Sequence, residues 1–157
     1  MKKIGVDFAE PVRPKKFLQQ VLYVEDNDAN WHVTELRLSR SYNLVRAKTD
    51  REACKILAQP TKLYAILMDV ELGGSRLNGM QLTKLIRGTL SHSELPDYAK
   101  NVPLLEVPVL FVTAYGDAYP RADLLACGAN DVLSKPVNFT QMNVALANLY
   151  INRVLER

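Results

Sequence analysis

Apolar residues gather in short runs along this chain, and each run has the length of a β-strand. The runs occupy residues 17–24, 43–48, 62–69, 108–114 and 130–134. Those at 62–69 and 108–114 are almost continuously apolar, which is typical of strands that are covered on both faces. We therefore predict a sheet whose central strands are buried on both sides.

Amphipathic segments follow these runs, with apolar residues recurring at helical spacing. Polar residues that favour helix N-termini, such as Thr49 and Asn138, precede several of them, and Gly128 follows the fourth as a helix terminator. The predicted helices span residues 29–40, 50–59, 78–88, 118–126 and 139 to the C-terminus.

The alternation of strand and helix predicts the fold class. Repeated right-handed βαβ crossovers produce a parallel sheet with helices on both faces. We expect an α/β protein, a flavodoxin-like (βα)5 three-layer sandwich whose parallel five-stranded sheet has the order 2-1-3-4-5.

Two stretches fall outside this alternation. Residues 1–16 contain scattered charges and prolines without a helical or alternating period, so we expect a flexible N-terminal extension. Residues 17–157 would then form one domain. Within it, residues 89–106 contain Pro96 and Pro103 and show no clear period, which predicts a lengthened connection.

Composition narrows the class of protein without indicating a function. With 157 residues, 48% of them hydrophobic, the chain suits one domain with a sizeable core. No stretch approaches the ~20 apolar residues of a membrane span, and no apolar signal segment precedes Pro11, so we expect a cytoplasmic protein with no membrane partner. Cys54 and Cys127 match no metal-ligand or redox spacing and are expected to be buried free thiols.

The net charge of +3 is modest, and several of the basic residues lie within the first sixteen positions. Direct binding to nucleic acid needs a basic face on an ordered element together with a reading helix. Because the rest of the chain has no such unit to spare, we expect no direct contact with nucleic acid.

Polar residues capable of chemistry stand where four of the predicted strands end. Glu25 and Asp26 follow the first strand, Asp69 ends the third, Thr113 lies in the fourth, and Lys135 follows the fifth. The carboxyl ends of parallel strands meet at one rim, where ligands of open α/β sheets bind. We expect these side chains to form a single site, although Asp69 taken alone could be an ordinary loop-opening residue.

Three carboxylates around one crevice repel each other unless a cation lies among them, and an all-oxygen pocket suits Mg²⁺. A carboxylate beside such an ion can attack a phosphoryl group in line, so Asp69 is a candidate nucleophile that becomes an aspartyl phosphate. The ammonium of Lys135 and the hydroxyl of Thr113 are suitable donors to the phosphoryl oxygens. The predicted chemistry is phosphoryl transfer to a carboxylate.

Four short motifs at these strand ends resemble the receiver domain of two-component response regulators. They are Val24-Glu-Asp-Asn27, Leu67-Met-Asp69, Val112-Thr-Ala114 and Ser134-Lys-Pro136. Each motif is weak by itself, but the four together in this order are specific. The resemblance covers about residues 17–157.

The resemblance implies a metal site and an acceptor. By it, Glu25 and Asp26 are the acidic pair that binds Mg²⁺, and Asp69 is both the phosphoacceptor and a metal ligand. The backbone carbonyl of Glu71 would be the remaining protein ligand.

The resemblance also implies roles for the residues around the phosphoryl group. Thr113 matches the switch hydroxyl, and the small Ala114 leaves the phosphoryl group room. Lys135 matches the phosphate-sensing lysine, with its bond to Pro136 expected to be cis.

Two features depart from the family pattern. Val132 stands where an aromatic residue usually reports the switch, so we hypothesise that the loop around Tyr115 and Tyr119 takes over this role. The connection at 89–106 is longer than usual, and it is either a partner-binding lid or an inert insertion.

These features lead us to expect a stand-alone response regulator receiver. It would be a phospho-accepting switch and not an enzyme, catalysing only its own phosphoryl transfer and dephosphorylation. Its phosphate would come from a sensor histidine kinase or a histidine phosphotransfer protein, and its output would be contact with a downstream protein. The family tends to make that contact through the fourth helix, fifth strand and fifth helix, a face that could also form a homodimer.

Two alternative functions match the pattern less well. A non-phosphorylated, receiver-like interaction scaffold is favoured slightly by Val132 and by the connection at 89–106, but the intact acids, threonine and lysine argue against it. A phosphoaspartyl hydrolase fits poorly, because Asp69-Val-Glu71 lacks the second aspartate of such enzymes.

Overall fold

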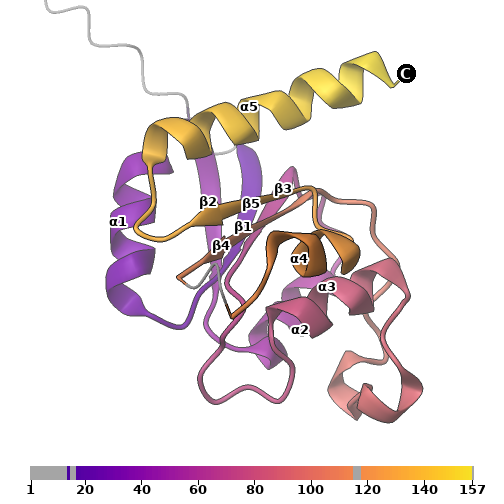
Figure 1. Cartoon of the computed structure of the whole chain (residues 1–157). Coiled ribbons are helices and arrows are strands. Elements are labelled where there is room, and N and C mark those ends of the chain that lie inside the picture. Colours follow the sequence, from indigo (N-terminus) through magenta and orange to yellow (C-terminus); the bar gives the residue numbers. More distant parts are fainter. Residues whose placement is uncertain (1–13, 15–16, 115–117, 157) are drawn as a thin grey trace, which may run out of the picture.

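The computed structural model describes Pro14, residues 17–114 and residues 118–156. Within these residues a 5-stranded sheet has the order β2-β1-β3-β4-β5, and all neighbouring strands are parallel (Figure 1). The strands are β1 (Gln19–Val24), β2 (Tyr42–Ala47), β3 (Ala65–Met68), β4 (Val109–Thr113) and β5 (Asp131–Ser134). The predicted fold class and strand order are confirmed.

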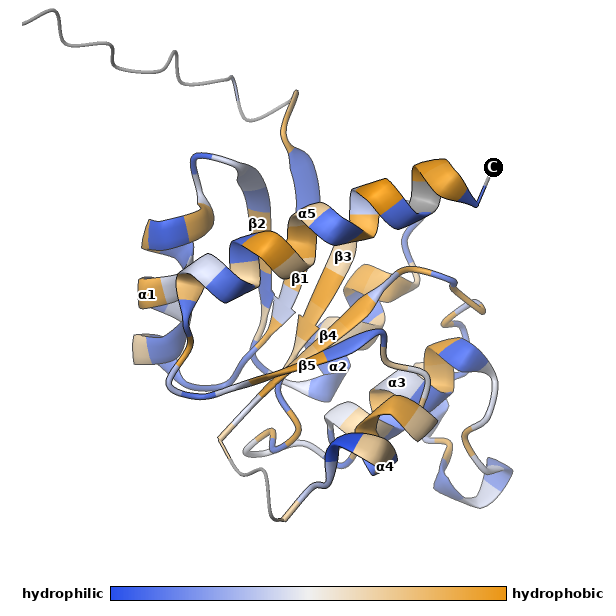
Figure 2. Ribbon diagram, turned by 45° about the horizontal axis from the view of Figure 1, so that its top comes forward, coloured by the Kyte–Doolittle hydropathy of each residue, from blue (hydrophilic) through white to orange (hydrophobic). Residues whose placement is uncertain are grey.

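Helices cover both faces of the sheet (Figure 1). One face carries α1 (Asp28–Leu38) and α5 (Phe139–Leu155), and the other carries α2 (Asp50–Leu57), α3 (Gly79–Arg87) and α4 (Arg121–Ala126). Successive side chains of a strand point to opposite faces. The buried strands therefore supply two apolar cores, one on each face of the sheet. The central strands carry the hydrophobic colour in Figure 2.

Helix starts follow ordinary capping chemistry. The side chains of Asn27, Thr49 and Asn138 each accept a backbone N–H three residues further on, at the starts of α1, α2 and α5. At α3, Asn78 and Gln81 form a reciprocal capping box. These caps explain why the helices begin directly after the strand-end loops.

Some elements are shorter than the apolar pattern predicts. β3 begins at Ala65, although the apolar run begins earlier. Leu63 and Tyr64 are buried ahead of it, and the N–H of Tyr64 donates to the carbonyl of Gln20 in β1 at 2.8 Å. α4 begins at Arg121, directly after Pro120. The strand ends that carry the polar residues are unaffected by these differences.

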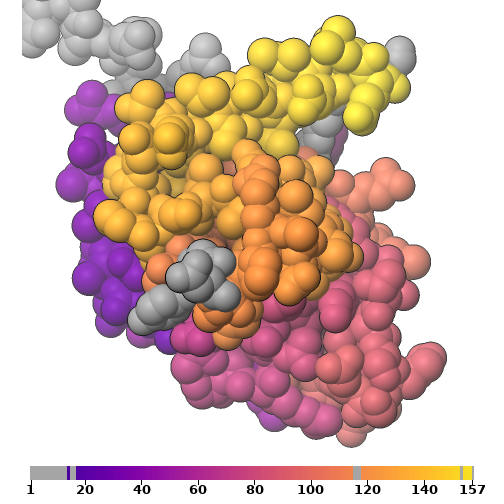
Figure 3. All heavy atoms as spheres, in the orientation of Figure 1, coloured from indigo at the N-terminus to yellow at the C-terminus, as the bar shows by residue number. Residues whose placement is uncertain are grey.

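Residues 89–106 form a packed connection that contains two short 3-10 helices, η2 (His92–Glu94) and η3 (Asp97–Ala99). This segment protrudes beside α2 and α3 in the space-filling view (Figure 3). The guanidinium of Arg87 donates to the carbonyls of Leu105 and Val107 at 2.6 and 2.7 Å. The end of the connection is thereby fastened to α3.

The fifth helix, α5, buries one side and exposes apolar residues near its end. Met142 and Leu146 are fully buried, whereas Ile151 and Leu155 are exposed. Hydrophobic and hydrophilic colours alternate along the ribbon of this helix (Figure 2). Among the helices described, none combines the length and the apolar content that crossing a membrane requires.

Candidate functional site

Three acidic side chains meet at the carboxyl end of the sheet. Glu25 and Asp26 directly follow β1, and Asp69 directly follows the neighbouring strand β3. One carboxylate oxygen of each acid lies within 4.8 Å of the others. They line a cleft of about 540 Å³, which we call the acidic cleft. The structure thus brings the acids of the sequence pattern together.

Glu25 is fully buried, and both of its carboxylate oxygens accept hydrogen bonds. Oε1 accepts from the backbone N–H of Asn27 (3.0 Å) and from the side-chain amide of Asn30 (3.4 Å). Oε2 accepts from the hydroxyl of Tyr23 (3.0 Å) and from Nζ of Lys135 (2.8 Å). Burial, reinforced by the charge of Glu25, raises the pKa of Tyr23, so this phenol stays protonated and remains a donor.

Lys135 places a positive charge among the acids. Its Nζ lies 2.8 Å from Oε2 of Glu25 and 2.9 Å from Oδ2 of Asp69, and 14% of its side chain is exposed. Burial works to lower the pKa of Lys135, but the hydrogen bonds to Glu25 and Asp69 raise it overall. Lys135 therefore stays charged. Its peptide bond to Pro136 is cis.

Asp69 is a buried acid with a raised pKa. Burial raises the pKa of Asp69 to about 6, against the lowering effect of Lys135, and the charge of Glu25 raises it further. Its Oδ1 accepts from the backbone N–H of Val70 at 2.8 Å. At neutral pH the carboxyl is ionised.

Asp26 is oriented by the loop that follows β3. Its Oδ2 accepts from the backbone N–H of Gly73 at 3.0 Å. A Cβ at position 73 would lie 2.9 Å from this same oxygen, so any other residue would push the carboxylate of Asp26 out of its present position. Gly73 is therefore part of the site through its backbone N–H, although it has no side chain.

The remaining predicted residues also lie at the acidic cleft. Thr113, which is 4% exposed, and Ala114 line it from the end of β4. Glu71 lines it as well, and its Oε1 accepts from the hydroxyl of Tyr119 at 3.0 Å. Tyr115 lies outside the described residues.

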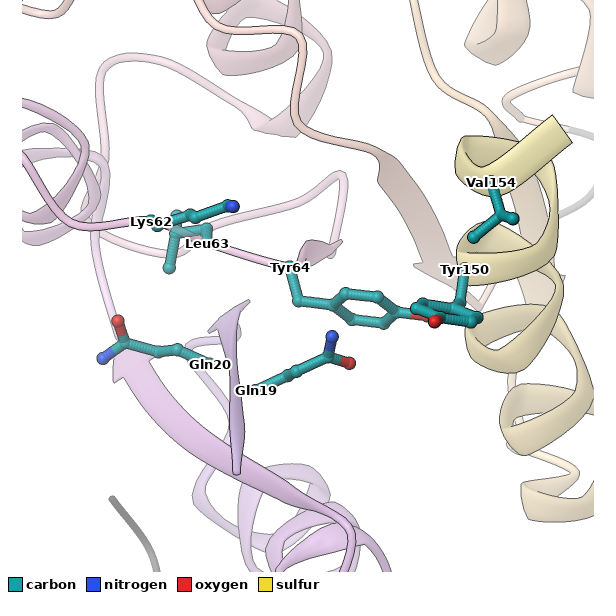
Figure 4. A pocket seen from close by; sticks show the side chains of 7 residues that line it. All are labelled: Gln19, Gln20, Lys62, Leu63, Tyr64, Tyr150 and Val154. Atoms are coloured by element: carbon teal, nitrogen blue, oxygen red, sulfur yellow. The ribbon is translucent and has the colours of Figure 1, made fainter. Parts of the chain in front are cut away.

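A second hollow, of about 390 Å³, lies at the other end of β1 and beside α5 (Figure 4). The rings of Tyr64 and Tyr150 reach into it from the segment before β3 and from α5. Its lining is Gln19, Gln20, Lys62, Leu63, Tyr64, Tyr150 and Val154. Because these residues include no acid and no histidine or cysteine, the acidic cleft is the better candidate for chemistry.

A family model described as the response regulator receiver domain matches residues 21–147, from β1 into α5. The chain belongs to the response regulator receiver family. Receiver domains are switches of two-component signalling, so this chain takes part in two-component signalling. They are generally not enzymes in the usual sense.

Individual relatives agree with this assignment. The receiver is 32% identical to the response regulator SSK1 of Verticillium dahliae over 170 residues, which cover 83% of this chain and 20% of that protein. It is 28% identical, with a TM-score of 0.65, to the receiver domain of a sensor histidine kinase from Pseudomonas aeruginosa PAO1. That structure, described with a magnesium ion coordinated in its active-site cleft, is matched over 97% of its chain and 84% of this one.

Solved structures with lower sequence identity support the fold alone. The receiver domain of NtrX from Brucella abortus is 20% identical, with a TM-score of 0.66, over 82% of this chain and 96% of that one. The receiver described here spans about a fifth to a quarter of the length of the curated relatives it matches.

Sequence reasoning missed the buried partners of the receiver's acids. Tyr23 was counted among the apolar residues of β1, yet its hydroxyl donates to Glu25. Arg46 donates from Nε and Nη2 to the carbonyls of Glu25 and Asp26, at 3.1 and 3.3 Å. A tyrosine inside a fully buried strand needs a partner for its hydroxyl, and this was the signal that could have indicated Glu25.

Proposed function

We propose that this receiver accepts a phosphoryl group on Asp69, with Mg²⁺ bound beside it, and signals through protein contacts. One observation carries the proposal: Asp69 shares the acidic cleft with two further acids and Thr113, and accepts a hydrogen bond from Lys135. A scaffold would gain nothing from this arrangement, because clustered buried charges are costly to fold. The non-phosphorylated scaffold is therefore not favoured.

The carboxylate oxygens of the acidic cleft fit Mg²⁺, which prefers oxygen ligands and retains several waters. Asp26 and Asp69 offer carboxylate oxygens, and Glu25 adds a third acid. The backbone carbonyl of Glu71 is the remaining proposed ligand. The ion, when bound, would neutralise the acids and the oxygens of the incoming phosphoryl group.

In the proposed transfer, a carboxylate oxygen of Asp69 forms a bond to the phosphorus of a phosphohistidine while the bond from phosphorus to nitrogen breaks. The imidazole leaves with the electron pair of that bond and takes up a proton from water. Lys135, which lies within hydrogen-bond distance of Asp69, is the proposed first donor to a phosphoryl oxygen. We assign the second donor to the hydroxyl of Thr113, and small Ala114 leaves space.

The proposed phosphoryl donor is a sensor histidine kinase or a histidine phosphotransfer protein, acting in the cytoplasm. The proposed output is contact with a downstream protein through the face of α4, β5 and α5, where a homodimer could also form. We propose no direct contact with nucleic acid or membrane. In this arrangement residues 17–157 act as the receiver domain and residues 1–16 as an extension.

Tyr119 is the proposed reporter of the switch, because Val132 cannot act as the usual aromatic reporter. Both residues pack against the core beneath α2, α3 and α4. The hydroxyl of Tyr119 also reaches Glu71 at the acidic cleft. Tyr119 therefore contacts both the cleft and the core.

Adding Mg²⁺ and beryllium fluoride, a mimic of a phosphoryl group, should shift the amide NMR signals of Ala118 and Tyr119. In Tyr119→Phe, which loses the bond to Glu71, these shifts should shrink. Tyr150→Phe, altered on the exposed side of α5, should respond as the wild type does. Amide signals of Ala118 and Tyr119 that stay in place in the wild type would rule Tyr119 out as the reporter.

Incubation with Mg²⁺ and acetyl phosphate should add the mass of one phosphoryl group to the wild type and nothing to Asp69→Asn. Intact-mass spectrometry measures this addition, and EDTA should prevent it. Asp97→Asn removes an exposed acid outside the cleft and should be modified normally. A wild type that stays unmodified with Mg²⁺ present would support the scaffold instead.

A further inference from the structure

The loop of residues 70–78, which joins β3 to α3, is held by a carboxylate at two places. The N–H of Gly73 donates to Oδ2 of Asp26 at 3.0 Å. Further along, the N–H of Leu77 donates to Oδ2 of Asp50 at 2.9 Å. One of these carboxylates belongs to the acidic cleft, and the other lies outside it on α2. The loop therefore links the two.

Asp50, the first residue of α2, is only 2% exposed. It accepts from the backbone N–H groups of Arg51 (2.8 Å) and Arg76 (3.2 Å), and its own N–H donates to the hydroxyl of Ser75 (3.0 Å). Burial works to raise the pKa of Asp50, but hydrogen bonds from Tyr98 and the backbone lower it overall. Asp50 is thus an ionised hub that fixes the end of the loop.

Tyr98 connects this hub to the long connection at 89–106. It lies in η3, and its hydroxyl donates to Oδ2 of Asp50, the oxygen that also holds the loop. The ring packs against the core, and the guanidinium of Arg51 lies over it, 4.2 Å from its centroid. An unbroken series of contacts therefore runs from the connection through Asp50 and the loop to Asp26.

We propose that Tyr98 and Asp50 are positioning residues that set the Mg²⁺ affinity of the acidic cleft by holding the loop of residues 70–78 against Asp26. The inference rests on the proposed function, since it concerns the same metal site. Without the hydroxyl of Tyr98, Asp50 retains only its bonds to the loop and its own helix. The loop then moves more freely, and Gly73 orients Asp26 less well.

Residues that orient metal ligands without touching the metal typically change its affinity by about tenfold or more when they are altered. The route from Tyr98 to Asp26 passes through a loop, so we expect a somewhat smaller effect. The connection at 89–106 is, on this proposal, neither an inert insertion nor a lid, but a support for the metal site.

Titration of the metal-free protein with MgCl₂ by calorimetry tests the proposal. Tyr98→Phe keeps the ring under Arg51 and should weaken Mg²⁺ binding about threefold to tenfold. Tyr150→Phe is the matched control and should bind as the wild type does. In an Asp50→Ala background, Tyr98→Phe should have no further effect, because the shared partner is gone.

Equal Mg²⁺ affinity in wild type and Tyr98→Phe would overturn the proposal, whatever happens to thermal stability. If the wild type binds no Mg²⁺, the proposed function fails. The coupling between Tyr98 and Gly73 through Asp50 is then tested without metal. Hydrogen exchange at the Gly73 amide should then be about tenfold faster in Tyr98→Phe than in the wild type. An unchanged exchange rate at Gly73 would show that Tyr98 does not hold the loop, and it would overturn the proposed coupling.

Discussion

Replacing Lys135 with Met is expected to lower the free energy of unfolding of the metal-free receiver by about 3 kcal/mol at neutral pH. The ammonium lies between Glu25, which is fully buried, and Asp69, whose side chain is 12% exposed. Removing one partner of a buried ion pair leaves the other charges without compensation. Urea unfolding in EDTA, followed by circular dichroism, measures the loss.

Mg²⁺ should restore much of the stability of Lys135→Met, because the ion supplies positive charge to the same carboxylates. Lys48→Met is the matched control: Lys48 pairs with Asp28 where both side chains are well exposed, so its loss should cost well under about 1 kcal/mol. A Lys135→Met protein as stable as the wild type in EDTA would show that the ammonium does not balance the acids.

Asp69→Asn should have the opposite effect and raise the free energy of unfolding of the metal-free receiver by about 1–3 kcal/mol at neutral pH. The folded-state pKa of Asp69 is raised from 3.8 to about 6, so the folded protein binds this proton more tightly than the unfolded chain does. The loss of folding free energy caused by ionising Asp69 therefore grows as pH rises from about 4 to 6, and it reaches its full size above pH 6.

The gain from Asp69→Asn should accordingly shrink as pH falls to about 4 and disappear below it, where Asp69 is protonated in both the folded and the unfolded state. With Mg²⁺ the order should reverse, since only the wild type retains the full set of acids. Thermal unfolding across this pH range measures both effects. A gain that is independent of pH would assign the stabilisation to something other than the charge of Asp69.

The fold could be predicted because the central strands are apolar throughout. The runs at 62–69 and 108–114 leave no polar face, and such strands are typical of a parallel sheet with helices on both sides. Element ends were less predictable, because Leu63 and Tyr64 are buried and the N–H of Tyr64 donates to Gln20 in β1, although β3 itself begins at Ala65.

The meeting of the candidate site residues was also predictable, since parallel strands bring Asp26, Asp69 and Thr113 to one rim. The pairing of Lys135 with Glu25 was not, because the two residues lie 110 positions apart and their contact depends on side-chain conformation. Asp50 was recognised only as a residue at a helix start. Its partner Tyr98 comes from a connection without any periodic pattern, so nothing in the sequence links the two.

Reductive trapping tests most directly whether Asp69 itself receives the phosphoryl group. Borohydride reduces an acyl phosphate to an alcohol and so converts a phosphorylated aspartate to homoserine, which peptide mass spectrometry locates. After treatment with Mg²⁺ and acetyl phosphate, we expect homoserine in place of Asp69 and unmodified residues at Glu25 and Asp26. Homoserine at another aspartate, or its absence from a protein that has gained a phosphoryl group, would contradict the assignment.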